Sequence, residues 1–349
     1  MFQALREELA TILDGIEIQS PHLFRFGDLP VTVQPGPVQP LAAFPQHPLP
    51  EIPIVWELQN ALYNFSYARP FRSQSWRQPP AAPAAPDLQF LELLARHNQT
   101  QSRWDTGWLV YQAMPNGQVF VQKGESQRSA MPGEFVLANM PGSGAQAGSP
   151  VSLYVQRDSA AAQLGFYFAF SDTLTDVWDE FSLLRFYFHV SSEGAPALLD
   201  YVTTTMNRFR IPFRFKTLAY PGHYDRADAA VLYTAKRYHH LVAHLVGNLP
   251  EAVANNLHET PPLYTYTIRD GVGMAEEPNT GESFGMNRCR MVAEGIYDAW
   301  IRGSQSTGDR LNAIAARFFW NGFDLARPHL NGSSIDLPPV PEEVGFDHA

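Results

Sequence analysis

The sequence predicts an α+β fold, in which a C-terminal mixed β-sheet flanked by helices follows an N-terminal region of helices and one β-hairpin. Apolar residues recur at three- and four-residue spacing near both ends of the chain, which is typical of helices. Several segments of the second half instead alternate apolar and polar residues, which is typical of strands. With 349 residues, 45% of them hydrophobic, the chain suffices for two domains or one large one, at roughly 100–200 residues per domain.

Residues 1–150 are predicted to form an N-terminal region that could bind a peptide or a partner. Prolines are too frequent at 29–53 and 79–86 for regular elements, so these stretches are connectors. Asn116 and Gly117 both tolerate positive φ and predict a tight turn. The predicted elements are a helix over Leu5–Ile16, a helix over Trp56–Phe65, a short helix capped by Asp87, and a hairpin of Trp108–Gln112 with Gln118–Gln122.

Residues 151–330 are predicted to form a second domain, which a glycine- and serine-rich stretch at 141–150 separates from the first. Residues 331–349 are predicted to be a proline-rich acidic tail. The predicted strands are Val151–Arg157, Phe166–Phe170, Leu184–Val190, Phe213–Leu218 and Ala229–Ala235, and the predicted helices are Ala195–Phe209, Tyr238–Val246, Asn287–Trp300 and Arg310–Phe319.

Charge and cysteine content exclude some classes of protein. The 25 basic and 35 acidic residues give a net charge of −10, which disfavours nucleic acid as a partner. The single cysteine, Cys289, excludes an internal disulfide, and no run of ~18 apolar residues could span a membrane. The first residues lack the basic region and apolar stretch of a signal peptide, so we expect a cytoplasmic protein that binds neither nucleic acid nor membrane.

Positive charge is concentrated in one segment of this acidic chain. Between Tyr201 and Pro250 there are seven basic residues and two acidic ones. The segment is therefore the first candidate for an anion site, although such clusters are more often solvated surface charges.

Two predicted strands have one apolar and one polar face. Arg185, Tyr187 and His189 alternate with apolar residues, so a cation, a phenol and an imidazole would line one face. This set suits an anionic substrate, and the alternative is a strand that faces solvent or a histidine with satisfied hydrogen bonds. Lys216 lies on the basic face of the other strand, where the alternative is an edge-strand lysine that discourages aggregation.

A turn-rich loop offers further ligands for an anion. It contains Tyr224 and Arg226 and leads into a strand that ends near Lys236. Ten residues of strand span ~33 Å, so Arg226 and Lys236 cannot both hold one phosphate unless the chain bends between them. We therefore favour Arg226.

A second loop, Gly271–Arg290, is rich in glycine and leads into a helix predicted to start near Gly285. Free N–H groups at a helix start attract anions, and Arg288 and Arg290 would add forked donors. Glu282 could orient either arginine. The loop has neither a Walker sequence nor dinucleotide-binding spacing, and the alternative is a mobile surface loop.

Two weaker signals point to other chemistry. His240 and His244 are four residues apart on a predicted helix, but no zincin glutamate lies between them, and a surface helix is the more common outcome. Cys289 could be a nucleophile, although a small buried thiol is more common. We expect no metal site.

Three segments resemble the HopA-type effector domain: RFYFHVSSEGAPALLDYVTTTMNRFRIPFRFKTL, YDRADAAVLYTAKRY and GVGMAEEPNTGESFGMNRCR. The resemblance covers roughly Leu184–Trp300, and the family includes plant-pathogen type III effectors and the lyase components of class V lanthipeptide synthetases. It implies phosphate elimination without a metal or an organic cofactor. In those pathways a kinase-like partner protein phosphorylates Ser or Thr of a precursor peptide, and the HopA-type protein removes the phosphate to leave dehydroalanine or dehydrobutyrine.

A more distant likeness to OspF-type phosphothreonine lyases implies the same chemistry. Those enzymes carry Lys-x-His on one strand, a lysine on a later strand and then an arginine-bearing segment. Here the same order is Tyr187-x-His189, Lys216 and Arg226. Tyrosine thus occupies the position of the catalytic lysine, which leaves the base to be assigned.

β-Elimination requires a base for the Cα proton, stabilisation of an enolate-like carbonyl and neutralisation of the departing phosphate. We assign Lys216 as the base, with Tyr187 as the second candidate, and His189 as the acid that protonates the phosphate. The residues assigned to bind phosphate or substrate are Arg185, Tyr224, Arg226, Tyr233, Lys236, Glu282, Arg288 and Arg290.

Two other functions stay open at this point. The same basic cleft could bind a phosphopeptide without catalysis, in a type III secreted effector or a peptide-recognition protein, and the missing strand lysine favours that interpretation. A metal-dependent hydrolase that uses His240 and His244 ranks last.

Overall fold

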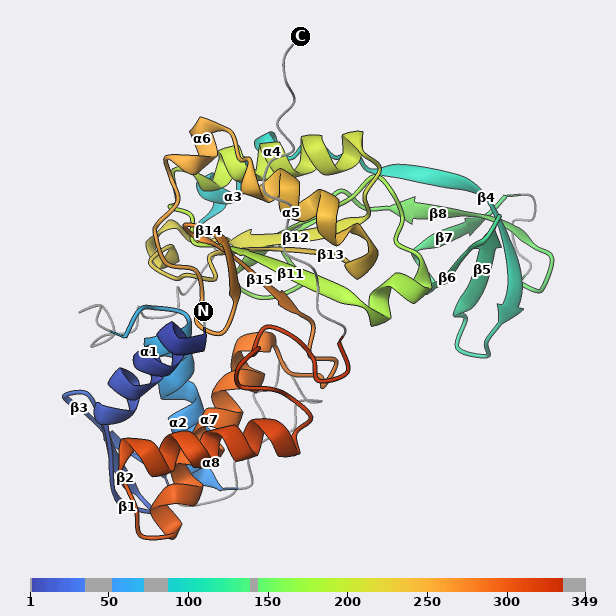
Figure 1. The fold of residues 1–349 in the computed structure, drawn as a ribbon. Coiled ribbons are helices and arrows are strands. Elements are labelled where there is room, and N and C mark those ends of the chain that lie inside the picture. Colours follow the sequence, from blue (N-terminus) through green and yellow to red (C-terminus); the bar gives the residue numbers. More distant parts are fainter. Residues whose placement is uncertain (1, 35–51, 72–86, 139–143, 335–349) are drawn as a thin grey trace.

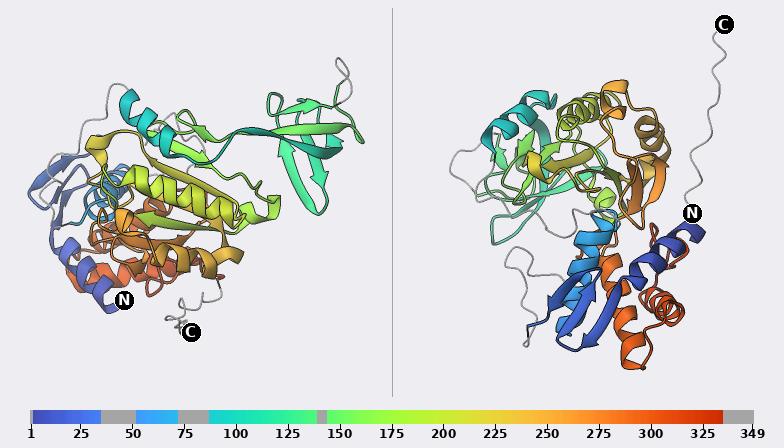
Figure 2. Two further views of the ribbon diagram at one scale, coloured as in Figure 1. Left: turned by 90° about the horizontal axis from the view of Figure 1, so that it is seen from above. Right: turned by 90° about the vertical axis from the view of Figure 1, so that its left-hand side faces the viewer.

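The computed structural model describes residues 2–34, 52–71, 87–138 and 144–334. These residues form three β-sheets of seven, five and three strands, with helices around the largest (Figure 1). The seven-stranded sheet lies in the middle, a lobe built from both ends of the chain lies below it, and the five-stranded sheet projects to one side (Figures 1 and 2). The predicted α+β class is confirmed.

The seven-stranded sheet has the order β14-β15-β11-β13-β12-β10-β9, and all its pairings are antiparallel. The expectation of a mixed sheet is therefore wrong. Helix α4 does connect two strands of the same direction, β11 and β12, but β13 inserts between them and pairs antiparallel with both. The strands are β9 (Asp158–Ser159), β10 (Phe166–Phe170), β11 (Leu183–Phe188), β12 (Phe213–Leu218), β13 (Ala230–Ala235), β14 (Tyr266–Arg269) and β15 (Val272–Glu276).

Helices α3, α4, α5 and α6 cover one face of this sheet (Figure 1). Phe186, Phe188 and Phe215 are completely buried in the apolar core on that side. Asp87 caps α3 as predicted, because its carboxylate accepts a hydrogen bond from the N–H of Phe90 at 3.0 Å. The elements here are α3 (Leu88–His97), α4 (Ala195–Arg208), α5 (His239–Gly247) and α6 (Glu251–Ala254), with 3₁₀ turns η3 (Val177–Phe181), η4 (Pro221–His223) and η5 (Lys236–Tyr238).

The lower lobe covers part of the opposite face. Tyr187, Val231 and Tyr233 of the sheet belong to the same apolar cluster as the lobe helices α2 and α7. Segments from both sides of residue 150 therefore share one core. The lobe elements are α1 (Phe2–Asp14), β1 (Ile16–Ser20), β2 (Leu23–Phe26), β3 (Leu29–Thr32), α2 (Pro53–Leu62), the π-helix η1 (Tyr63–Tyr67), α7 (Phe284–Ile301) and α8 (Thr307–Trp320).

The projecting sheet has the order β6-β5-β4-β8-β7 and a small core of its own around Trp108 and Val110. The hairpin predicted at Asn116–Gly117 is present, with Gly117 at φ +85°. Strand β8 starts at Pro150, so the predicted boundary at residue 150 lies within this sheet. Its strands are β4 (Arg103–Ala113), β5 (Val119–Lys123), β6 (Ser126–Ala130), β7 (Phe135–Leu137) and β8 (Pro150–Val155).

The predicted elements of the second half lie within a few residues of the observed ones, and the largest difference is β15. This strand was expected as part of a glycine-rich loop, but all five of its residues are buried between β14 and β11. A strand buried on both faces lacks the alternation that marks a strand in sequence. Most of the proline-rich connectors and of the tail lie outside the described residues.

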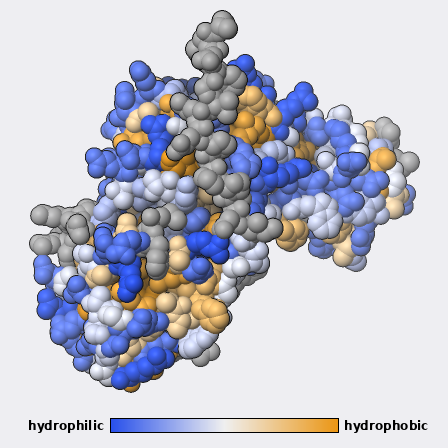
Figure 3. Space-filling view, viewed as in Figure 1, coloured by the Kyte–Doolittle hydropathy of each residue, from blue (hydrophilic) through white to orange (hydrophobic). Residues whose placement is uncertain are grey.

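The surface of the lower lobe is apolar in part. In the view of Figure 3, hydrophobic residues gather around α8 and are bordered by hydrophilic ones. Ile301, Phe319 and Trp320 are among the exposed large hydrophobic residues of this lobe. No helix in the described ranges is both long and apolar enough to cross a membrane.

Candidate functional site

The face of the large sheet opposite α4 carries two rows of functional side chains. Residues opposite each other on antiparallel neighbours point to the same face. The register of β11, β13 and β12 therefore aligns Arg185, Tyr233 and Arg214 in one row. Tyr187 and Lys216 are aligned in the next row, with Val231 between them. The face predicted from the alternation in both strands is thus brought together.

We call the polar side chains of these two rows the array. Three cations of the array surround the ring of Tyr233. The guanidinium carbons of Arg185 and Arg214 lie 5.2 and 4.7 Å from its centroid, and Lys216 Nζ lies 5.8 Å away. Burial raises the pKa of the Tyr233 phenol, but the three positive charges outweigh burial, so the net shift is downward. Tyr233 is therefore easier to deprotonate than an ordinary tyrosine.

The three cations around Tyr233 differ in their partners. Arg185 is held by both carboxylate oxygens of Glu277, whereas the other two have no carboxylate partner. Lys216 Nζ instead donates to the amide oxygen of Gln163 at 3.2 Å and lies 4.4 Å from the ring centroid of Phe166. Within the described ranges, neither Arg214 nor Lys216 forms an ion pair. An anion that reaches this face would meet two cations that have no ion-pair partner.

Tyr187 lies deeper in the same face. Its ring meets that of Tyr67 edge to face, with centroids 6.4 Å apart, and its hydroxyl lies 3.5 Å from a guanidinium nitrogen of Arg185. Burial raises the pKa of Tyr187, although Arg185 opposes the shift. Tyr187 is thus protonated at neutral pH and is a weaker candidate base than the sequence suggested.

His189 lies just beyond the end of β11, almost completely buried. Its Nδ1 is 2.7 Å from the carbonyl oxygen of Thr260, which fixes the proton on Nδ1 and leaves the lone pair on Nε2. Burial lowers the pKa of His189 to about 4, and the adjacent ring of His258 contributes in the same direction. The imidazole is therefore neutral at pH 7.

Arg226 is close to this face, but its guanidinium already binds other residues of the protein. Its Nε and Nη2 each donate to Asp228 at 2.8 Å, and Nη2 also donates to the hydroxyl of Tyr63 at 2.9 Å. Burial opposes ionisation of Asp228, but the charge of Arg226 prevails and lowers the pKa of the carboxyl. Lys216 adds to that shift, and Asp228 acts in turn on His189. The Arg226–Asp228 pair thus links Lys216 and His189, two of the three predicted catalytic residues, electrostatically.

The phosphate cradle predicted at the start of α7 is not formed. Arg288 is completely buried and donates to the carbonyl oxygens of Pro328 at 2.7 Å and Leu330 at 3.1 Å. Burial lowers the pKa of Arg288 to about 9. Arg290 donates to the carboxylates of Glu282 and Glu294. Both arginines therefore hold the fold together rather than face a ligand.

Tyr224 and Lys236 are also placed in structural contacts. The hydroxyl of Tyr224 donates to the carbonyl of Leu218 at 2.7 Å, and its ring packs against Phe90 in the core on the helical side of the sheet. Lys236 pairs with the buried carboxylate of Glu276. Neither residue lies with Lys216.

Sequence reasoning missed one member of the array and the two tyrosines that cover it. Arg214 alternates with Lys216, so its place on the basic face was visible in the sequence, but it was not selected. Tyr63 and Tyr67 come from the π-helix that ends α2, and stack at 5.3 Å toward the sheet. Nothing in sequence links that helix to β11, since more than 100 residues separate them.

The weaker signals found in sequence gain no support. No group of three or more His, Cys, Asp or Glu side chains suited to a metal occurs in the part of the chain that the structure describes. His240 and His244 lie on the exposed side of α5. Cys289 is completely buried, and burial raises the pKa of its thiol, which makes it a poor nucleophile.

The fold and the array define an α+β protein with an antiparallel central sheet, one face of which carries a cluster of arginine, lysine, tyrosine and histidine. Residues 157–330 match the model of the HopA1 effector protein family. This part of the chain therefore belongs to that family, and the HopA-type resemblance is confirmed.

Two solved structures are similar to the chain. One is an effector protein from Pseudomonas syringae pv. tomato strain DC3000, with 14% identity, a TM-score of 0.43, and coverage of 95% of this chain and 97% of that one. The other is an effector protein from Pseudomonas syringae pv. syringae strain 61, with 15% identity, a TM-score of 0.40, and coverage of 78% and 88%. No curated protein sequence matches the chain.

Proposed function

We propose that this protein is a phosphoserine or phosphothreonine lyase. It would remove phosphate by β-elimination from a precursor peptide phosphorylated by a kinase-like partner, as in lanthipeptide-type biosynthesis. The observation that carries the proposal is a pair of cations without an ion-pair partner, Arg214 and Lys216, beside a phenol of lowered pKa. The same sheet includes strand β11, which leads to the neutral His189.

The reaction needs only acid–base groups and positive charge. A base removes the Cα proton, the C–H electron pair forms the Cα–Cβ double bond, and the Cβ–O bond breaks with its electrons on the phosphate. Phosphoserine gives dehydroalanine and phosphothreonine gives dehydrobutyrine. The cations stabilise the departing phosphate and the negative charge that develops on the carbonyl.

Lys216 is the base in this proposal, and Arg214 binds the phosphate. Lys216 lies at the open end of the array, where its amine bonds to a neutral amide rather than to an acid. Tyr233 replaces Tyr187 as the second candidate base, because three cations favour its phenolate whereas burial keeps Tyr187 protonated.

His189 acts as the acid only after substrate binds. Its pKa of about 4 leaves it unprotonated in the free protein at neutral pH. A phosphate dianion near Nε2 favours the imidazolium and raises that pKa, so substrate binding would bring its own proton donor into the required state. The proton then passes from Nε2 to a phosphate oxygen as the Cβ–O bond breaks.

The second candidate function is a type III secreted effector or phosphopeptide-binding protein without lyase activity. One observation favours it: Tyr187 stands where OspF-type lyases carry a lysine, and its buried phenol is protonated. The description of the matched family as effector proteins is compatible with this candidate.

Mass spectrometry of a phosphorylated peptide incubated with the protein separates the two candidates. A lyase removes about 98 mass units, as phosphoric acid, and leaves an alkene that reacts with an added thiol. Loss of about 80 mass units would indicate a phosphatase and would contradict the lyase proposal. Binding of the peptide with no change in mass would favour the second candidate.

A further inference from the structure

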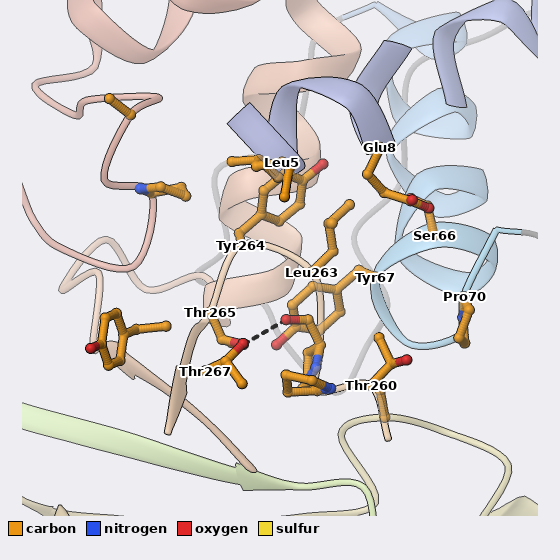
Figure 4. Close-up of a pocket in the computed structure, with 17 residues that line it drawn as sticks. Leu5, Glu8, Ser66, Tyr67, Pro70, Thr260, Leu263, Tyr264, Thr265 and Thr267 are labelled. Carbon is orange, nitrogen blue, oxygen red and sulfur yellow. Dashed lines mark hydrogen bonds between the residues drawn. The ribbon is translucent and has the colours of Figure 1, made fainter. Parts of the chain in front are cut away.

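A cavity of about 660 Å³ lies beside the candidate site, between the start of α1, the π-helix η1 and the loop before β14 (Figure 4). Its walls are mainly prolines, tyrosines and leucines, including Leu5, Tyr67 and Leu263. Such a lining suits apolar side chains of a ligand rather than its phosphate.

The cavity adjoins the candidate site through two of its lining residues. Thr260 lines the cavity, and its carbonyl oxygen holds the Nδ1 of His189 at 2.7 Å. Ala227 also lines it and lies between Arg226 and Asp228 in the chain. A ligand with its phosphate near His189 would therefore direct its neighbouring residues into this space.

An edge strand of the large sheet forms part of one wall. Strand β14 is the last strand of the seven-stranded sheet, and Tyr266 and Thr267 line the cavity. The outer N–H and C=O groups of an edge strand can pair with an extended peptide. The adjoining Tyr264 has φ +73° and a buried hydroxyl without a hydrogen-bond partner in the described structure. Backbone strain of this kind gathers at binding sites.

Glu8 is the one charged side chain among the described residues that line the cavity. It points from α1 toward Ser66 across the cavity (Figure 4). Within the described ranges Glu8 forms no ion pair, whereas the surrounding wall is apolar. A basic residue of the ligand would therefore complement it.

We propose that this cavity binds the segment of the peptide substrate that flanks the phosphorylated residue. The segment lies extended along β14, with an apolar side chain against Leu5 and Leu263 and a basic side chain at Glu8. This inference rests on the proposed function, because it takes a phosphorylated peptide as the ligand of the neighbouring site.

The test uses fluorescent phosphothreonine peptides of about nine residues, which span ~30 Å when extended. Lysine is moved through every flanking position of an otherwise neutral sequence, and Kd is measured by fluorescence anisotropy. We expect one position at which lysine tightens binding by up to about 5-fold, the upper end of what a single exposed ion pair contributes. Glu8→Gln should abolish this preference, and Glu8→Lys should transfer it to a peptide with glutamate at that position.

Glu7→Lys is the matched control, since Glu7 lies on the same helix outside the cavity and should leave the preference unchanged. A lysine preference that persists in both Glu8 variants would overturn the cavity assignment. The same peptides are analysed by mass spectrometry. Glu8-dependent binding without elimination would support the cavity and overturn the lyase, whereas elimination without Glu8-dependent binding would do the reverse. Failure of every peptide to bind would overturn both.

Discussion

The exposed end of β12 and the start of α7 are both rich in positive charge in the sequence. The fold pairs the arginines of α7 with acceptors but gives the cations of β12 no carboxylate partner. On α7, Arg288 donates to two backbone carbonyls and Arg290 lies between two carboxylates. On β12, Arg214 and Lys216 face a phenol and a neutral amide. A basic residue can meet a substrate anion only where the fold does not already supply an acceptor. We therefore expect β12 to bind the substrate and α7 to serve a structural role.

The largest effect is expected for Lys216→Arg on the β12 side of this comparison. Arginine retains the positive charge but cannot lose a proton near neutral pH. Phosphopeptide binding should survive, while the elimination rate should fall by about 10²-fold or more, as is typical when a positioned base is lost. Single-turnover elimination and the Kd of the same peptide measure both quantities.

An active Lys216→Arg protein would contradict the assignment of the base and would direct attention to the two phenols. In that case Tyr233→Phe should abolish elimination, because its phenolate is favoured by three cations, whereas Tyr187→Phe should retain it. Activity in all three variants would mean that none of these residues is the base.

The second prediction concerns α7, where Arg288→Met should lower the free energy of unfolding by about 2 kcal/mol. The substitution leaves the carbonyls of Pro328 and Leu330 buried without a donor. The elimination rate of the folded protein should change little. Denaturant unfolding measures the first effect, with the exposed Arg302→Met at the end of the same helix as the control. A loss of elimination without a loss of stability would place Arg288 in the site after all.

The sequence predicted the sheet face but not the state of each charge on it. Alternation in the two strands was sufficient to place Arg185, Tyr187 and Lys216 on one face, because strand geometry is local. Arg288 and Arg290 could not be interpreted in the same way. The carbonyls that accept hydrogen bonds from Arg288 lie about 40 residues further along the chain, and only the tertiary structure brings them close to it. The covering tyrosines of η1 are likewise distant in sequence.

The third prediction concerns the role of Arg214 on β12 and uses the variant Arg214→Gln. The variant should weaken phosphopeptide binding by about 10-fold, in line with the loss of a hydrogen bond to a charged group. Binding of the unphosphorylated peptide should not change. Arg208→Gln removes an exposed arginine at the end of α4, in the same basic segment, and should leave both affinities unaltered. Equal effects of the two variants would mean that the segment attracts anions only through its overall charge.

The smallest effect concerns pH and distinguishes the buried His189 from a solvated histidine. Its pKa is lowered from 6.5 to about 4 by burial, so between these values the unfolded chain binds a proton that the folded protein does not. Stability should therefore fall as the pH falls through this window, with a slope that approaches about 1 kcal/mol per pH unit near pH 5. His189→Asn keeps a donor for the Thr260 carbonyl but cannot titrate, so its unfolding free energy should lack that component of the slope.

Bound phosphate would raise the pKa of His189 and make the fold less sensitive to acid, so the wild-type slope should diminish when a phosphopeptide is present at saturation. A slope that is the same in the variant and in the wild-type protein would show that folding does not change the pKa of His189, so that His189 behaves as a solvated histidine and not as a buried neutral imidazole.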